Sequence, residues 1–155
     1  MDKQEILQLL KEQLKAEIQR LQAANKQAAA GATDSESRAE SKWDTQGLEA
    51  SYLARGYAAQ FDSMNEQAKL LNDLSPASFT DKPIGTGALV KCDFDGYKSW
   101  VFILPCCGGT ELIIEDQEVT VVTPESPLAA SLAGKVEGDS YTLSNGASGT
   151  ILRVE

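Results

Sequence analysis

The chain has 155 residues, with 14 basic and 23 acidic side chains, no histidine and three cysteines, and its formal net charge is −9. This length suits one or two small domains and excludes a large multidomain enzyme. The lack of histidine excludes Ser/His/Asp and Cys/His triads and His-ligated zinc. Because phosphate backbones repel an acidic chain, we expect no independent binding to duplex DNA; a basic protein partner or a bound cation fits the charge better.

The cysteines point to a reducing compartment. Cys92, Cys106 and Cys107 are odd in number, and the adjacent pair cannot form a disulfide of ordinary geometry. No apolar leader precedes the first residues, and no apolar run approaches the roughly 20 residues that cross a bilayer. We therefore expect a soluble, cytoplasmic protein with no membrane contact. Without histidine or a Cys-x-x-Cys spacing, we interpret residues 106–109 as a turn with free thiols rather than a stable metal or redox site.

Composition changes at Ser75-Pro76. All five prolines and nine of the twelve glycines lie at or beyond this point. The change predicts a helical domain over residues 1–75 and a strand-and-turn domain over residues 76–155.

The first part carries two apolar stripes at helical spacing. The first helix is predicted from Leu7, Leu10, Leu14, Ile18, Leu21, Ala24 and Ala28, and the second from Ala50, Leu53, Tyr57, Phe61, Met64, Ala68 and Leu71. Gly31 is a natural helix stop, so the pattern predicts an antiparallel coiled-coil hairpin whose tip lies near residues 30–44. Helices of roughly 26 to 33 residues are about 40 to 50 Å long, so we expect a projecting arm.

The second part predicts a mainly antiparallel β domain with one short helix. Asp95-Gly96 between two β-rich runs, 87–94 and 97–104, is a strong hairpin signal. Further strands are predicted near 110–115, 118–123, 140–143 and 149–154, and a short helix follows Ser126-Pro127 and ends at Gly134. The predicted core contains Leu89, Val101, Ile103, Ile113, Val119, Val121, Leu128, Leu132, Ile151 and Val154.

One stretch resembles a known family. Thr123-Pro124-Glu125-Ser126-Pro127-Leu128, followed by Leu132-Ala133-Gly134-Lys135 and Gly138-Asp139, is similar to the C-terminal motif of the Gre transcript-cleavage factors. The order and size of the two predicted parts also match that family, in which a coiled coil precedes an FKBP-like domain. The resemblance implies an α+β protein: an antiparallel α-helical coiled-coil hairpin followed by an FKBP-like, mainly antiparallel β domain.

The resemblance also implies a function. A Gre-type factor binds bacterial RNA polymerase through its β domain and inserts its coiled coil into the secondary channel, where acidic tip residues act on the active-centre magnesium and promote cleavage of backtracked RNA. The factor is then an accessory protein and not an enzyme. It has no cofactor of its own, holds Mg²⁺ only jointly with the polymerase, and meets the nascent RNA end only within that complex.

The tip offers acidic side chains of the right chemistry, because carboxylate oxygens suit Mg²⁺. They are Asp34, Glu36, Glu40 and Asp44. Cleaving members of the family carry an Asp-Leu-x-Glu-Asn-type tip, which residues 31–36 do not reproduce, and Arg38 and Lys42 interleave with the acids. Two readings of these residues stay open: acids that hold the metal, and acids that cap a helix or pair with neighbouring cations.

The segment Glu125, Ser126, Pro127 and Leu128 is the predicted polymerase-docking element, although serine and proline are also ordinary residues for a helix start. Two alternatives to a cleavage factor remain. One is a secondary-channel regulator that only binds or occludes the channel. The other is a coiled-coil protein that uses a β domain of this type to engage an unrelated partner.

Overall fold

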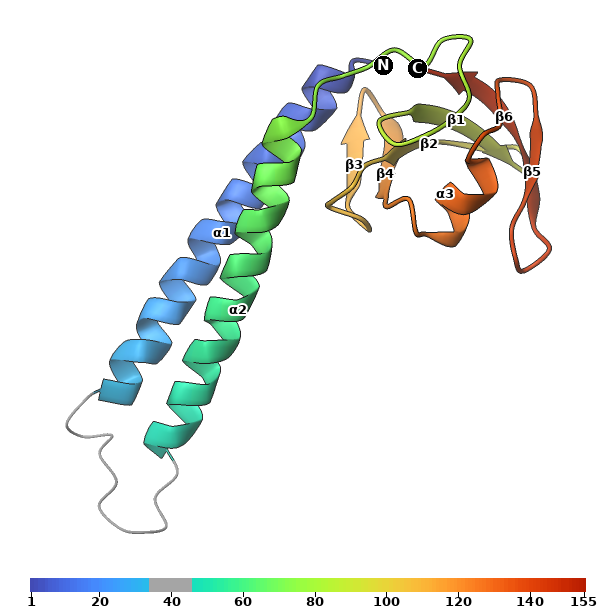
Figure 1. The fold of residues 1–155 in the computed structure, drawn as a ribbon. Helices are drawn as coiled ribbons and strands as arrows, with labels where there is room; N and C mark the ends of the chain where they lie inside the picture. Colours follow the sequence, from blue (N-terminus) through green and yellow to red (C-terminus); the bar gives the residue numbers. More distant parts are fainter. Residues whose placement is uncertain (34–45) are drawn as a thin grey trace. The chain divides into compact units, whose positions relative to one another are not determined.

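The computed structural model describes residues 1–33 and 46–155 and consists of two long helices followed by a six-stranded mixed sheet with one short helix (Figure 1). The predicted α+β fold is therefore confirmed. The elements are α1 (Lys3–Thr33), α2 (Gln46–Asp73), β1 (Leu89–Phe94), β2 (Tyr97–Ile103), β3 (Glu111–Ile114), β4 (Gln117–Val122), α3 (Pro127–Leu132), β5 (Ser140–Thr142) and β6 (Ser148–Val154).

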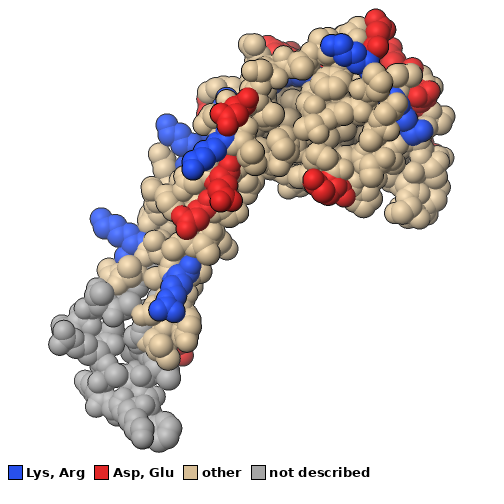
Figure 2. Space-filling model, viewed as in Figure 1, with Lys and Arg blue, Asp and Glu red and all other residues tan. Residues whose placement is uncertain are grey.

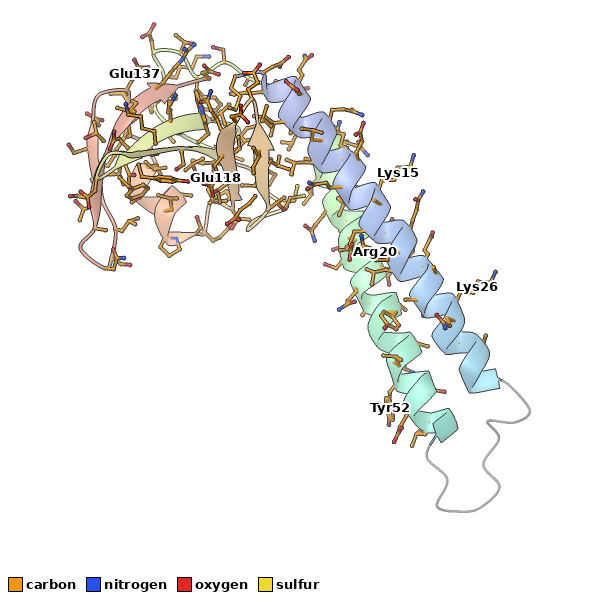
Figure 3. The ribbon with its side chains drawn as sticks, turned by 180° about the vertical axis from the view of Figure 1, so that it is seen from behind. Lys15, Arg20, Lys26, Tyr52, Glu118 and Glu137 are labelled. Carbon is orange, nitrogen blue, oxygen red and sulfur yellow. The ribbon has the colours of Figure 1, made fainter. Side chains whose placement is uncertain are left out.

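The chain forms two compact units. One contains Leu9–Lys69, and the other contains Met1–Gln8 together with Leu70–Glu155. The first residues of α1 and the last residues of α2 thus group with the sheet. The rest of α1 and α2 forms an antiparallel helical hairpin by itself (Figures 1 and 3).

The start of α1 follows from local capping. The Asp2 carboxylate accepts a hydrogen bond from the Gln4 amide at 2.8 Å, and the Ile6 amide donates to the Asp2 carbonyl at 3.2 Å, so Asp2 closes the first turn. The predicted stripe of α1 is at least partly buried from Leu7 to Ala24. The helix continues through Gly31 to Thr33, so the prediction that it ends at Gly31 is wrong.

The apolar stripe of α2 lies where it was predicted, except at Leu53. Tyr57, Phe61 and Met64 are half-buried as expected, but Leu53 is 53% exposed and Ala54 takes its place. None of the helices in the described chain combines the length and hydropathy that a bilayer crossing requires.

The sheet has the order β3-β4-β2-β1-β6-β5. β2 and β4 pair in parallel, with Phe102 opposite Val121, and the other neighbours are antiparallel. Asp95 (φ 49°) and Gly96 (φ 87°) form a two-residue hairpin turn between β1 and β2, as predicted. Positive φ at both turn residues matches the right-handed twist of the paired strands.

The central strands are buried on both faces. On one face lies a cluster that also takes in α3, comprising Ile84, Ala88, Val90, Cys92, Val101, Ile103, Val122, Ala129, Leu132, Tyr141, Ile151 and Val154. On the other face, Leu89, Phe102 and Val121 are almost fully buried, although they alternate with residues of that cluster along the same strands. Every predicted core residue in these strands is therefore confirmed.

Two predicted core residues behave differently. Ile113 is 79% exposed, so its assignment to the core is wrong. Its strand, β3, has Leu112 and Ile114 on the buried face, and Ile113 occupies the opposite face at the end of the sheet. Leu128 is only partly buried, at the edge of the cluster.

A buried ammonium group ties the first turn of α1 to the start of the sheet. Lys3 Nζ donates to the carbonyl oxygens of Ala77 at 2.7 Å and Gly87 at 2.8 Å, and it lies 5.0 Å from the centre of the Phe79 ring. Burial lowers the pKa of Lys3, and Glu155 partly opposes this shift. A cation near a helix N-terminus is unfavourable, and these carbonyls and the ring offset that cost.

Gly149 permits a close approach inside the β domain. A Cβ added there would collide with the backbone oxygen of Asp93 and would lie 2.6 Å from the Tyr141 hydroxyl oxygen. Tyr141 is itself buried and packs edge-on against Phe94, with the ring centroids 5.1 Å apart. Any larger residue at 149 must therefore displace a strand or a core aromatic ring.

We predict opposite effects for two glycine substitutions. Gly149→Ala should lower the free energy of unfolding by about 2 kcal/mol or more, because of the backbone collision. Gly56→Ala, in α2, should raise it by about 0.5 to 1 kcal/mol, since a Cβ at 56 meets nothing within 4 Å and alanine favours the helix. Urea unfolding monitored by circular dichroism measures both; a stabilised G149A variant would contradict the packing described here.

We also predict loss of stability at alkaline pH. Burial raises the pKa of the Cys92 thiol to about 11 and that of Cys106 to about 12, and burial and Cys92 raise the pKa of Tyr141. A group whose pKa is higher in the folded state contributes stability below its unfolded pKa, and this is lost as pH rises through the folded pKa. From about pH 9 to pH 11, Cys92 alone should cost about 2 to 3 kcal/mol.

Urea unfolding at a series of pH values tests this expectation. The Cys92→Ala variant is less stable at neutral pH, but its unfolding free energy should decline less steeply above about pH 9. An equally steep decline in the variant would show that Cys92 does not contribute.

Candidate docking site

The sequence-predicted site residues fall into two groups. The tip acids Asp34, Glu36, Glu40 and Asp44 lie outside the described residues. The docking segment Glu125–Leu128 lies between β4 and α3 and is described in full.

Ser126 caps α3. Its backbone is extended (φ −67°, ψ 146°), and its hydroxyl accepts a hydrogen bond from the Ala129 amide at 3.1 Å. Its carbonyl accepts from the Ala130 amide at 2.9 Å, and Pro127 occupies the first helical position, where no amide donor is needed. The helix-start reading of this pair is therefore confirmed. The serine side chain is engaged within the chain.

The exposed members of the segment are Glu125 and Pro127. Leu128 is half-buried against the core cluster, and Ala129 and Leu132 are buried in it. The segment thus exposes the carboxylate of Glu125 and the ring of Pro127 to solvent. Ser126 and Leu128, which alternate with them, fix the start of the helix.

The end of α3 is held by a reciprocal pair of backbone hydrogen bonds. The Gly134 amide donates to the Ile84 carbonyl at 2.9 Å, and the Ile84 amide donates to the Lys135 carbonyl at 2.8 Å. Gly134 has φ 76°, a conformation that glycine adopts without strain at the end of a helix. The role of Ile84, 50 residues earlier in the chain, was not predicted, because a backbone-to-backbone bridge leaves no mark in residue type.

The Gly138-Asp139 part of the motif starts the last hairpin. The Asp139 carboxylate accepts from the Val136 amide at 2.9 Å and closes a tight turn, while Gly138 adopts φ 90°. The Gly138 amide donates to the Ile151 carbonyl at 2.8 Å, which aligns this turn with β6. Most of the motif residues from 126 to 139 are therefore structural.

The unit that contains the site is strongly acidic. Residues 1–8 and 70–155 carry 14 acidic and six basic side chains, a formal charge of −8 out of the total of −9. Along the helical hairpin, by contrast, side chains of both signs are seen (Figure 2), and Lys15 and Lys26 extend from α1 on the side away from α2 (Figure 3). A partner that binds the β domain is consequently expected to be basic.

The thiols offer no metal site within the part of the chain that the structure describes, where no three His, Cys, Asp or Glu side chains are grouped to hold an ion. Cys92 and Cys106 are buried and Cys107 is half-buried. Burial raises the pKa of all three, so at neutral pH they are protonated and poorly nucleophilic.

No protein-family model and no curated protein matches the chain. Three structures of Gfh1 are among the solved structures that are similar to it. They are GreA factor homolog 1 (Gfh1) of Thermus thermophilus (19% identity, 94% of each chain, TM-score 0.38), the transcription factor Gfh1 (18% identity, 94% of this chain and 92% of that one, TM-score 0.38) and Gfh1 of Thermus aquaticus (20% identity, 97% and 92%, TM-score 0.39). Likeness at this level establishes neither membership of a family nor an activity.

Proposed function

We propose that this chain is a transcription elongation factor that binds RNA polymerase through its β domain and acts in the secondary channel through its helical hairpin. In this proposal the acids Asp34, Glu36, Glu40 and Asp44 help to hold a magnesium ion at the polymerase active centre, and the polymerase itself then cleaves backtracked RNA. The chain supplies no catalytic centre of its own.

The proposal is supported by the structure of the motif at 123–139, which is folded and leaves two side chains exposed. The residues that resemble the Gre motif form one folded element, with Ser126, Gly134 and Asp139 fixing its helix and turns. They leave Glu125 and Pro127 exposed at the start of α3, as a docking element requires. The helical hairpin, which precedes this element in the chain, provides the second part of the proposed factor.

The chemistry of the proposal is electrostatic. Mg²⁺ prefers oxygen ligands and keeps several waters, so one or two added carboxylates are enough to retain an ion that the polymerase alone binds weakly. A retained ion lowers the pKa of its water and stabilises the charge that develops on the scissile phosphate. The hairpin's part is therefore to supply carboxylates, and cleavage should require Mg²⁺ at all times.

The second candidate function is a channel-binding regulator that occludes the site without promoting cleavage. The sequence of the tip favours it, because residues 31–36 lack the Asp-Leu-x-Glu-Asn pattern and Arg38 and Lys42 lie among the acids. The two functions share the partner and differ only in what the tip does.

We predict that the purified protein shortens RNA in backtracked elongation complexes. Replacing Asp34, Glu36, Glu40 and Asp44 by alanine should slow that cleavage by roughly 10- to 100-fold, the usual scale for groups that hold or orient a catalytic metal. A higher Mg²⁺ concentration should reduce the difference in cleavage rate between the variant and the unaltered chain, because it restores occupancy of a metal site whose affinity has been lowered. Gel electrophoresis of end-labelled RNA measures the rate.

The matched control is Asp62→Ala with Glu66→Ala, two exposed acids on α2. It should cleave like the unaltered chain. If the unaltered chain binds polymerase and slows elongation but yields no shortened RNA, the occluding function holds and the cleavage proposal is wrong.

We predict that docking depends on Glu125 and Pro127. The double variant Glu125→Lys, Pro127→Ala should bind polymerase at least about tenfold more weakly, since it reverses one contact charge and removes one apolar contact. Its melting temperature should fall by no more than about 2 to 4 °C, because both side chains are exposed and only the fixed backbone of one proline is lost. Binding is measured by titration of fluorescent protein with polymerase.

Two variants separate docking from stability. Ser126→Ala loses a helix cap and should melt about 2 to 4 °C lower, yet the folded fraction should still bind. Asp62→Lys gives the same change of charge as Glu125→Lys on the hairpin and should bind normally. Full affinity of the double variant would remove residues 125 and 127 from the proposed interface.

A further inference from the structure

β3 is the terminal strand of the described sheet and has an orderly outer edge. Thr110, just before it, is a bonded partner of Val121, because its carbonyl accepts from the Val121 amide at 2.8 Å. Opposite residues in an antiparallel pair alternate between bonded and non-bonded. Glu111 and Ile113 therefore form non-bonded pairs with β4, and their own N–H and C=O groups point out of the sheet.

The turn after β3 fixes this register. Glu115 (φ 51°) and Asp116 (φ 59°) both have positive φ and connect Ile114 to Gln117, which are direct partners. A two-residue turn of this type makes its flanking residues a bonded pair. The turn and the Thr110 bond therefore agree that positions 111 and 113 carry the outward backbone groups.

The same two residues expose their side chains. Ile113 is 79% exposed and Glu111 is exposed, while Leu112 and Ile114 are buried on the other face. Nearby, Tyr97 is 59% exposed, and its hydroxyl donates to the carboxylate of Glu118 on β4, which is labelled in Figure 3. An apolar surface of this kind, next to free backbone groups, is unusual for a protected sheet edge.

The charge of the side chains around β3 indicates what kind of partner strand can bind there. The side chains of Tyr97, Lys98, Ile113 and the acids Glu111, Asp116 and Glu118 border a shallow hollow of about 520 Å³, and Glu115 adds a further negative charge in the adjacent turn. A natural sheet edge is often protected by lysines; this one is acidic and carries an exposed isoleucine. It attracts basic strands and repels acidic ones.

We propose that the outer edge of β3 is a docking surface for an extended, basic segment of a partner protein, which adds to the sheet as a seventh strand. Its backbone bonds to Glu111 and Ile113. On the exposed face its lysine or arginine side chains cover Ile113 with their methylene groups and pair with Glu111. On the other face of the sheet, the apolar residues of the added strand lie beside Leu112 and Ile114.

A second copy of the chain does not suit this surface. Two β3 edges paired with each other would place the acids of both copies together, and like charges that face each other across strands are destabilising. The proposal is independent of polymerase binding, because it rests on β3 and β4 and on neither the hairpin tip nor Glu125–Leu128.

The test uses the full chain and a fluorescein-labelled seven-residue peptide that alternates lysine with valine. We expect saturable binding, measured by fluorescence anisotropy, with the amide signals of Glu111 and Ile113 shifted and protected from exchange in NMR spectra. The same peptide, N-methylated at every second residue on its bonding edge, should bind at least about tenfold more weakly, since it cannot form the ladder. A peptide that alternates glutamate with valine should not bind.

Variants locate the surface. Glu111→Lys with Glu115→Lys should weaken binding at least about tenfold, and Ile113→Ser should weaken it by a similar factor. The matched control, Asp62→Lys with Glu66→Lys on α2, has the same change of net charge and should lower affinity less than about threefold. Circular dichroism checks that each variant is folded.

Three results overturn the proposal. Equal loss of binding in the α2 control means unspecific attraction to an acidic protein, and equal binding of the methylated peptide means that no strand is added. If the unaltered chain dimerises and the Ile113→Ser variant is monomeric, the occupant is a second copy and not a basic partner. A failure of polymerase binding, by contrast, affects only the function proposed above.

Discussion

Burial of the central strands on both faces is the constraint that organises the β domain. Leu89 and Val90 in β1, and Val101 and Phe102 in β2, are consecutive residues that point to opposite faces, and all four are almost fully buried. These four side chains are therefore not available for contact with a partner. Exposed groups of this domain lie instead at the strand ends, the sheet edges, the turns and the start of α3, where an interaction can take place.

The same constraint explains why the motif around α3 serves structure and surface together. α3 has to lie over one face of the sheet, and its caps and the Ile84 bridge hold it there through backbone groups. The side chains of Ser126 and Asp139 accept hydrogen bonds from backbone amides within the motif, whereas Glu125 and Pro127 are exposed. The motif therefore contains residues that position a surface and residues that form it.

Much of the fold could be predicted from the sequence, because hydrophobic periodicity and turn residues report local structure directly. The Asp95-Gly96 hairpin and the Ser126-Pro127 helix start are examples. Ile113 shows the limit: its strand alternates as a half-buried strand should, but only the position of β3 at the end of the sheet decides which side is covered. The helix also passed through Gly31, since a single glycine costs only about 1 kcal/mol within a helix.

Lys3 joins the first turn of α1 to the β domain. By binding two carbonyls from segments near 77 and 87, it makes the first turn of α1 part of the sheet's unit, and residues 70–73 of α2 share that unit. Each helix is continuous but contributes residues to two compact units. The hairpin can therefore fray or be clipped by a protease as far as residues 9 and 69 while the amides at its root keep the protection of the β domain.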